Sequence, residues 1–283
     1  MDLSFTILNV FTSVPYAGKP LAIVHIPHSL STLTPAQKLA IAQEFNHPAT
    51  LFLSDLSPDA TLAPIEIYTP TAPIPFASHA VLGAAFHLFR TRAHPHLRAL
   101  VTIAGEIPIE AGEVLEIEGV EAEIPHAFHI YPRTAATPWP IVAIAQDMAF
   151  NLVELPDVAA LANVSEGVTL AAAEEQDAPA SVGTYYYVQP AVAHNVQQLR
   201  TRMFSRGEGG EKEDAATGRA AAALAGYLAV RDGAKFFQIM QGVEMGRESS
   251  IGVEVTTTAD GRGVSRVVVT GGAVEVMMGS LTV

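Results

Sequence analysis

The chain has 283 residues, 49% of them hydrophobic, and a formal net charge of −13 at pH 7. This length allows two domains, each with its own core. The acidic balance and the lack of any basic run argue against a nucleic-acid-binding protein. Because the sequence contains no cysteine, disulfides, thiolate metal ligands and a cysteine nucleophile are excluded.

The N-terminal segment lacks the basic region and long apolar stretch of a secretory signal. No window of the sequence reaches the roughly 18 consecutive apolar residues of a membrane span. We therefore expect a cytoplasmic protein that has no membrane partner.

The first half of the chain predicts strands on either side of two helices. One helix begins after Thr34, because threonine caps helices well and Pro35 suits the first helical position. The second helix covers 79–91 and is rich in Ala and Leu. The predicted strands are 3–11, 21–26, 50–54, 64–69, 99–104, 107–110 and 113–118.

The second half repeats this order around a second Ala-rich helix at 216–231. Further helical stretches are predicted near 155–163 and 194–203. The predicted strands are 127–131, 140–145, 183–188, 235–240, 250–257, 264–269 and 273–276. The repeat of about 130 residues is too long for a solenoid.

A helix that is apolar on nearly every side must be surrounded by other elements. We therefore predict an α+β fold with two pseudo-symmetric domains, 1–126 and 127–283. Each domain is expected to be a curved, barrel-like sheet wrapped around its Ala-rich helix. The final strand is free to pack back on the first domain.

Small polar clusters stand at the starts of the two Ala-rich helices: Ser78 and His79 at the first, and Asp214, Thr217, Gly218 and Arg219 at the second. The free N–H groups and the dipole at a helix start attract anions. Two such ends facing one another would bind a small carboxylate-bearing molecule, with Asp214 and His79 placed to move protons.

Motifs over the whole chain resemble the phenazine-biosynthesis isomerase family (PhzF-like), which shares its fold with diaminopimelate epimerase. They are Asn9-Val-Phe-Thr, Ala17-Gly-Lys-Pro-Leu-Ala-Ile-Val, Ile41-Ala-Gln-Glu-Phe-Asn, Pro75-Phe-Ala-Ser-His-Ala-Val-Leu-Gly, Glu213-Asp-Ala-Ala-Thr-Gly, Gln241-Gly-Val-Glu-Met-Gly-Arg and Val269-Thr-Gly-Gly-Ala-Val-Glu-Val. The resemblance implies an active site in a cleft between two domains, no cofactor and, commonly, a homodimer. The helix starts described above favour a small anionic substrate.

The chain departs from this family at the catalytic position. The family carries a proton-shuttling glutamate in a segment of the form Asn-x-Ser-Glu-Thr, whereas residues 46–50 here read Asn-His-Pro-Ala-Thr, which places Ala49 at that position. His79 and Asp214 are retained. The other departures from the family pattern are Lys19, Pro73, Ser78 and Arg219.

Each candidate residue has more than one interpretation. Asp214 is favoured as the acid/base over a simple helix-start carboxylate, and His79 as a neutral donor or base. Ser78 is expected to cap the first Ala-rich helix. Arg219 either clamps a substrate carboxylate or pairs with Glu213 or Asp214.

Thr217, Gly218 and Ala49 complete the expected substrate-binding set. The histidine pairs 94/96 and 126/129 have no carboxylate at metal-ligand spacing, so no metal site is assigned.

Three functions compete at this stage. The preferred one is a cofactor-independent isomerase of small-molecule, secondary metabolism, with Asp214 as acid/base and His79 as its partner. The second is a lyase or cyclase that shapes a reactive substrate in the same cleft. The third is a catalytically inactive homologue that binds a ligand. Because Ala49 carries no proton, the family's reaction on dihydro-hydroxyanthranilate is not expected.

Overall fold

The computed structural model describes residues 2–27, 33–114, 117–131, 138–145, 148–168, 182–193, 195–207 and 210–283. The chain forms two compact units, Met1–Glu123 with Thr270–Val283, and Ile124–Val269. It therefore passes from one unit to the other twice. The sequence-based division at 126/127 lies three residues from the first of these passages, and the C-terminal strand belongs to the first unit.

The first unit is built around a sheet in the order β18-β1-β2-β3-β4-β6-β7-β8, with β5 paired to the end of β4. Its elements are β1 (Asp2–Val10), β2 (Lys19–Ile26), α1 (Pro35–Phe45), β3 (Thr50–Ser54), β4 (Leu62–Tyr68), β5 (Pro73–Ile74), α2 (Ser78–Phe86), the π-helix η1 (His87–Thr91), β6 (Ala99–Thr102), β7 (Gly105–Val114), β8 (Ile117–Glu123) and β18 (Ala273–Thr282).

The second unit is built around the strand order β9-β10-β11-β12-β13-β15-β16, with β14 paired to the end of β13. Its elements are β9 (His129–Tyr131), β10 (Ile141–Ala145), β11 (Met148–Glu154), α3 (Val158–Ala162), β12 (Val182–Ala193), β13 (Val196–Gly207), β14 (Gly210–Asp214), α4 (Gly218–Asp232), β15 (Phe236–Gln241), β16 (Ser249–Thr257) and β17 (Val264–Gly271).

The two units share one topology. In the first, α1 joins the parallel strands β2 and β3, and α2 joins the parallel strands β4 and β6. In the second, α3 joins the parallel strands β11 and β12, and α4 joins the parallel strands β13 and β15. A short strand, β5 or β14, precedes each long central helix. This correspondence confirms the pseudo-symmetric two-domain α+β fold.

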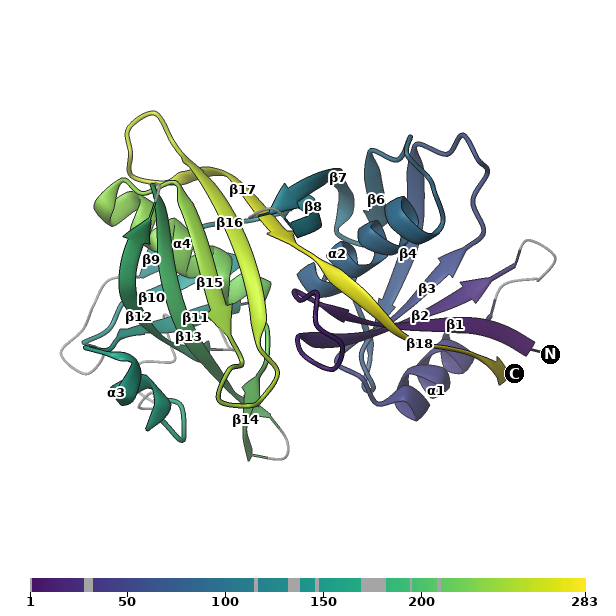
Figure 1. The fold of residues 1–283 in the computed structure, drawn as a ribbon, viewed down its shortest axis with the longest axis horizontal. Coiled ribbons are helices and arrows are strands. Elements are labelled where there is room, and N and C mark those ends of the chain that lie inside the picture. The colour runs from purple at the N-terminus through teal and green to yellow at the C-terminus, as the bar shows by residue number, and fades with distance from the viewer. Residues whose placement is uncertain are drawn as a thin grey trace. The chain divides into compact units, whose positions relative to one another are not determined.

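Each Ala-rich helix lies among the strands of its own unit (Figure 1). Every residue of α2 except Phe86 is buried, and so is every residue of α4 from Ala220 to Ala229. The fit is close, since a Cβ atom on Gly83 would lie 2.5 Å from the Leu21 side chain. No helix in the described ranges is long and apolar enough to cross a membrane.

Several sequence-based assignments are wrong. The stretch 194–203, predicted helical, belongs to β13 (residue 194 itself lies outside the described residues). The predicted strand 113–118 spans the turn of the β7–β8 hairpin, in which Val114 pairs with Ile117 (residues 115–116 lie outside the described residues). In addition, β11 was not predicted. Leu199, Thr201 and Met203 of β13 alternate with polar residues and are buried, which is the two-residue period of a strand. The predicted helix 79–91 is α-helical only to Phe86 and continues as the π-helix η1.

Candidate active site

The polar cluster at the start of α2 lies inside the first unit. The helix begins at Ser78, and its N-cap is Ala77, which is extended (φ −147°, ψ 121°) and makes no side-chain capping hydrogen bond. Ser78 is therefore not the cap that the sequence suggested, because the chain leaves the extended conformation one residue earlier. Ser78 and His79 are both buried.

Ala49 occupies an enclosed, apolar position directly before β3. Its side chain is completely buried, and its carbonyl oxygen accepts a hydrogen bond from the Ala22 amide at 3.4 Å. The neighbouring Thr50 hydroxyl is also buried and has no hydrogen-bond partner among the described residues. A methyl group here gives no titratable function at the position where the family pattern has its glutamate.

Asp214 ends β14 and stands before α4, rather than at its cap or in its first turn. Its Oδ2 atom accepts a hydrogen bond from the Thr217 hydroxyl at 2.7 Å, and its Oδ1 atom accepts one from the Ala216 amide at 3.3 Å. Thr217 is the N-cap of α4, but its hydroxyl is directed to Asp214 and does not cap the helix. The carboxylate is therefore held in one orientation at the helix start.

A buried network of Gln241, Tyr185 and Thr201 holds the loop that carries Asp214. The Gln241 side-chain amide donates to the Asp214 carbonyl oxygen at 2.7 Å, while its Oε1 atom accepts from the Tyr185 hydroxyl at 2.9 Å and from the Thr217 amide at 3.3 Å. The Thr201 hydroxyl in turn donates to the Tyr185 oxygen at 2.9 Å. Sequence reasoning favoured a structural role for Gln241 but did not connect Tyr185 or Thr201 to Asp214.

Tyr185 remains a neutral hydrogen-bond donor in this network. Its side chain is completely buried, and burial raises the pKa of its phenol well above the ordinary value of about 10. The charge on Asp214 adds to this rise in pKa. A phenol with such a pKa keeps its proton near neutral pH, so its hydrogen bond to Gln241 persists.

The residues around Asp214 leave little freedom to the backbone. Gly242, which follows the network glutamine, has φ +76°, and a Cβ atom there would lie 2.7 Å from the Ala215 carbonyl oxygen. Gly218 begins α4 and is buried. The loop that carries the candidate base is thus packed tightly against the chain that follows β15.

Arg219 does not form the ion pair with Glu213 that the sequence left open. Both Glu213 oxygens accept hydrogen bonds from Arg202, each at 2.7 Å. Glu213 of β14 is paired with Phe204 of β13, and Arg202 lies two residues from Phe204 on the same strand. The Arg219 Nη1 atom lies 3.9 Å from the Met148 sulfur. The binding of a substrate carboxylate by Arg219 stays a prediction.

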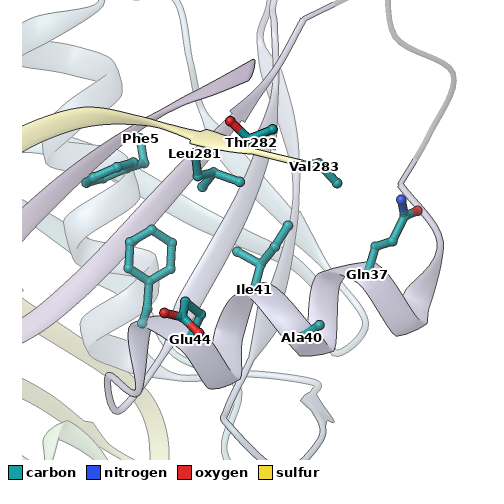
Figure 2. Close-up of a pocket in the computed structure, with 9 residues that line it drawn as sticks. Phe5, Gln37, Ala40, Ile41, Glu44, Leu281, Thr282 and Val283 are labelled. Carbon is teal, nitrogen blue, oxygen red and sulfur yellow. The ribbon is translucent and has the colours of Figure 1, made fainter. Parts of the chain in front are cut away.

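Two other features of the described residues bear on catalysis. No group of three or more His, Asp or Glu side chains in the described ranges is arranged to bind a metal ion. A groove of about 550 Å³ lies between α1 and the end of β18, lined by apolar side chains such as Phe5, Ile41 and Leu281 (Figure 2). Its ionisable side chain is Glu44, which has no acid or base partner within the groove lining.

A family model described as phenazine biosynthesis-like protein (PhzC-PhzF) matches residues 8–279. The chain belongs to this family. It is 31% identical over 298 residues to trans-2,3-dihydro-3-hydroxyanthranilate isomerase of Pseudomonas fluorescens, covering 98% of this chain and 99% of that protein. It is 26% identical over 263 residues to an uncharacterized isomerase of Pasteurella multocida, covering 89% and 86% of the two chains.

Solved structures confirm the fold of this PhzC-PhzF family member. A Bacillus anthracis protein of the PhzF family superposes with a TM-score of 0.76 at 18% identity over the full length of both chains. A hydroxyproline epimerase of Agrobacterium vitis superposes with a TM-score of 0.61 at 13% identity, covering 99% of this chain and 92% of the other. The epimerase-like fold and the isomerase class expected from the sequence are therefore confirmed. The roles of individual site residues stay predictions.

Proposed function

We propose that this isomerase works without a cofactor and moves a proton between two carbon atoms of a small, carboxylate-bearing substrate of secondary metabolism. The substrate site would include the loop before α4, and the working protein would be a homodimer, as the family resemblance implies. One observation carries the proposal: the Asp214 carboxylate is oriented at a helix start by Thr217 and Ala216 above a buried network.

Asp214 would act as a single base and acid. Its carboxylate removes a proton from a substrate carbon next to a conjugated carbonyl group, and the C–H electron pair becomes an enolate. The protonated Asp214 then returns that proton to a different carbon, the double bonds shift, and the carboxylate is regenerated. Atoms and electrons balance in these two steps without an oxidant or a reductant.

The start of α4 would stabilise the enolate. The amide groups in the first turn of α4, beginning at Gly218, point outward from the helix start, where the dipole favours negative charge. Such preorganised donors are an effective form of transition-state stabilisation. His79 is buried in the first turn of α2, and its part as a hydrogen-bond donor or base in catalysis stays a prediction.

The enclosed methyl group of Ala49 supports a substrate different from that of the Pseudomonas relatives. Without a second carboxylate at this position, proton movement depends on Asp214 alone. The same observation favours a second candidate function, a lyase or cyclase in which the site shapes a reactive substrate and one acid suffices. We therefore do not expect turnover of trans-2,3-dihydro-3-hydroxyanthranilate.

The first prediction tests Asp214 by hydrogen exchange. Small unsaturated carboxylic acids are incubated with the protein in D₂O, and NMR follows exchange of their carbon-bound protons. Asp214→Asn should slow this exchange by at least about 10²-fold, because general acid/base groups contribute about 10²–10⁴-fold in rate. Asparagine keeps one acceptor oxygen for the Ala216 amide, and its NH₂ group can donate to the Thr217 hydroxyl oxygen, so the unfolding midpoint should change little. His79→Gln should cost less.

Asp260→Asn is the matched control. Asp260 also accepts hydrogen bonds from a threonine hydroxyl, Thr258, and from a backbone amide, Arg262, but in an exposed turn. This variant should keep the full exchange rate. If Asp214→Asn exchanges as fast as the unchanged protein while Arg219→Ala does not, Asp214 is not the base and the substrate-shaping function replaces the isomerase mechanism.

A further inference from the structure

A second polar cavity lies in the first unit at the C-terminal end of α2 and η1, whereas Ser78 and His79 lie at the start of α2. Its volume is about 300 Å³, which is within the range of small-molecule sites, about 300–1,000 Å³. The side chains that line it are His25, Leu53, Ser54, Asp55, Leu56, Leu88, Arg92 and His94. None of these residues belongs to the proposed active site.

The π-helix η1 brings Arg92 over His87. The Arg92 amide donates to the His87 carbonyl oxygen at 3.0 Å, which is the five-residue hydrogen bond of a π-helix. The Arg92 side chain contacts the same residue, because its Nε–H group donates a hydrogen bond to the His87 Nε2 atom at 3.3 Å. In an α-helix, residues five apart do not stack in this way, so the π-turn sets the position of the guanidinium.

Glu275 fixes the histidine that supports Arg92. The Nδ1 atom of His87 lies 2.7 Å from the Glu275 Oε1 atom, which also accepts from the Thr91 hydroxyl at 2.5 Å. Since the Arg92 Nε–H must donate, His87 Nε2 accepts and Nδ1 carries the proton that is donated to Glu275. Burial lowers the pKa of His87, which agrees with this neutral form.

The hydrogen bond between Arg92 Nε and His87 leaves the two Nη groups of Arg92 available to a ligand. Its two Nη groups have no protein acceptor in the part of the chain that the structure describes, while Nε is bound to His87. A planar guanidinium with two parallel N–H donors matches a carboxylate in a bidentate arrangement. The cavity therefore carries a positioned carboxylate-binding group.

The rest of the lining is both anionic and aliphatic. Asp55 also borders the cavity, and within the described ranges neither Asp55 nor Arg92 takes part in an ion pair. The aliphatic lining consists of the partly exposed Leu56 together with Leu53 and Leu88, which are almost wholly buried. Separate positive and negative groups beside an apolar surface suit a zwitterion with an aliphatic side chain better than a phosphate or another dianion.

We propose that this cavity binds an aliphatic α-amino acid. The ligand carboxylate is held by the two Nη groups of Arg92, its ammonium group faces Asp55, and its side chain contacts Leu56. Glu275 and His87 act as positioning residues for Arg92. This site does not depend on the proposed function.

The test compares L-leucine with two analogues, each lacking one charge. 4-Methylpentanoate lacks the ammonium group, and 3-methylbutylamine lacks the carboxylate. NMR of histidine-labelled protein follows the ring signals of His25 and His94, which line the cavity. L-Leucine should shift both signals in a saturable way, and each analogue should bind at least tenfold more weakly.

Two variants separate the contributions of the charges. Arg92→Gln should weaken L-leucine binding at least tenfold, whereas Asp55→Asn should weaken L-leucine but leave 4-methylpentanoate unchanged. Arg98→Gln, in the same loop but outside the cavity lining, is the matched control and should bind normally. Asp214→Asn should also bind normally, which separates this site from the proposed active site.

Three results would overturn the proposal. The absence of a saturable shift of His25 and His94 with L-leucine in the unchanged protein would remove the site. Arg92→Gln binding L-leucine as tightly as the unchanged protein would remove the carboxylate contact. Equal binding of 4-methylpentanoate and L-leucine would remove the zwitterion selectivity, even if an anion binds.

Discussion

The buried amide of Gln241 offers a direct test of how the candidate base is held. Gln241→Met keeps the length of the side chain but removes its hydrogen bonds to Asp214, Thr217 and Tyr185. Because glutamine and methionine have similar volumes, packing changes little. The substitution therefore reports mainly on the polar network.

The expected loss follows from the hydrogen bonds. The two short bonds, at 2.7 and 2.9 Å, contribute about 0.5–1.5 kcal/mol each, and a buried group left without a partner costs about 1–3 kcal/mol. Since Gln241 and Tyr185 are completely buried, water cannot replace the lost partner. We expect Gln241→Met to lower the free energy of unfolding by about 3–5 kcal/mol.

Urea unfolding followed by tryptophan fluorescence measures this loss. The chain has one tryptophan, Trp139, which packs against the buried cluster of Val153, Leu161 and Phe204 in the second unit. The fluorescence therefore reports on the unit that contains Gln241. Tyr185→Phe alone should cost about 1–3 kcal/mol, and it should cost about 1 kcal/mol less in the Gln241→Met background, because the two side chains are coupled.

Gln238→Met is the matched control in the same strand. Gln238 is buried and donates one hydrogen bond, to the Ser250 hydroxyl at 2.5 Å. Gln238→Met should therefore lower the free energy of unfolding by about 1 kcal/mol. The hydrogen-exchange activity should fall with Gln241→Met and persist with Gln238→Met. If Gln241→Met is no more destabilising than Gln238→Met, or if the Tyr185 and Gln241 effects are additive, the network does not hold the Asp214 loop.

Two further predictions concern the first unit. Ala49→Glu should destabilise the protein by several kcal/mol near neutral pH, because the methyl group is fully buried and burying a charge is costly. Burial would raise the pKa of the new carboxyl group, so urea midpoints should show a smaller loss of stability near about pH 4. Burial, followed by the charges of Arg92 and His87, lowers the pKa of His25 to about 4. The folded state then binds fewer protons than the unfolded state, whose histidine pKa is about 6.5. The contribution of neutral His25 to the free energy of unfolding should be fully present above about pH 6.5 and should fall by about 3 kcal/mol as the pH approaches 4. His25→Gln should remove this part of the pH dependence in urea titrations. An unchanged slope would contradict the assignment.

The sequence by itself determined the architecture, because its strongest signals are local. Helices made of Ala, Gly and Leu on every face can be stable only when they are enclosed, and both α2 and α4 are enclosed. The start of α1 was equally readable, since Thr34 and Gln37 form a capping box before a proline-initiated helix. The family motifs placed Asp214 beside the start of α4 for the same reason.

Local signals failed where non-local pairing decides the outcome. The stretch 194–203 was compatible with a helix until β13 paired with β12 on one side and β15 on the other, which fixes it as a strand. Ser78 resembled a cap, but Ala77 is the extended N-cap residue and Ser78 is already the first residue of the helix. The residues of these two segments do not determine which strands β13 pairs with or at which residue α2 begins.

The tertiary structure alone decided which side chains support the candidate sites. Thr201, Tyr185 and Gln241 lie on three different strands and meet beneath Asp214. Glu275, from the far end of the chain, orients His87 on the π-helix. Hydrogen bonds between residues so far apart leave no periodic pattern in the sequence, because they depend on strand order and register, and these are set only when the whole unit folds.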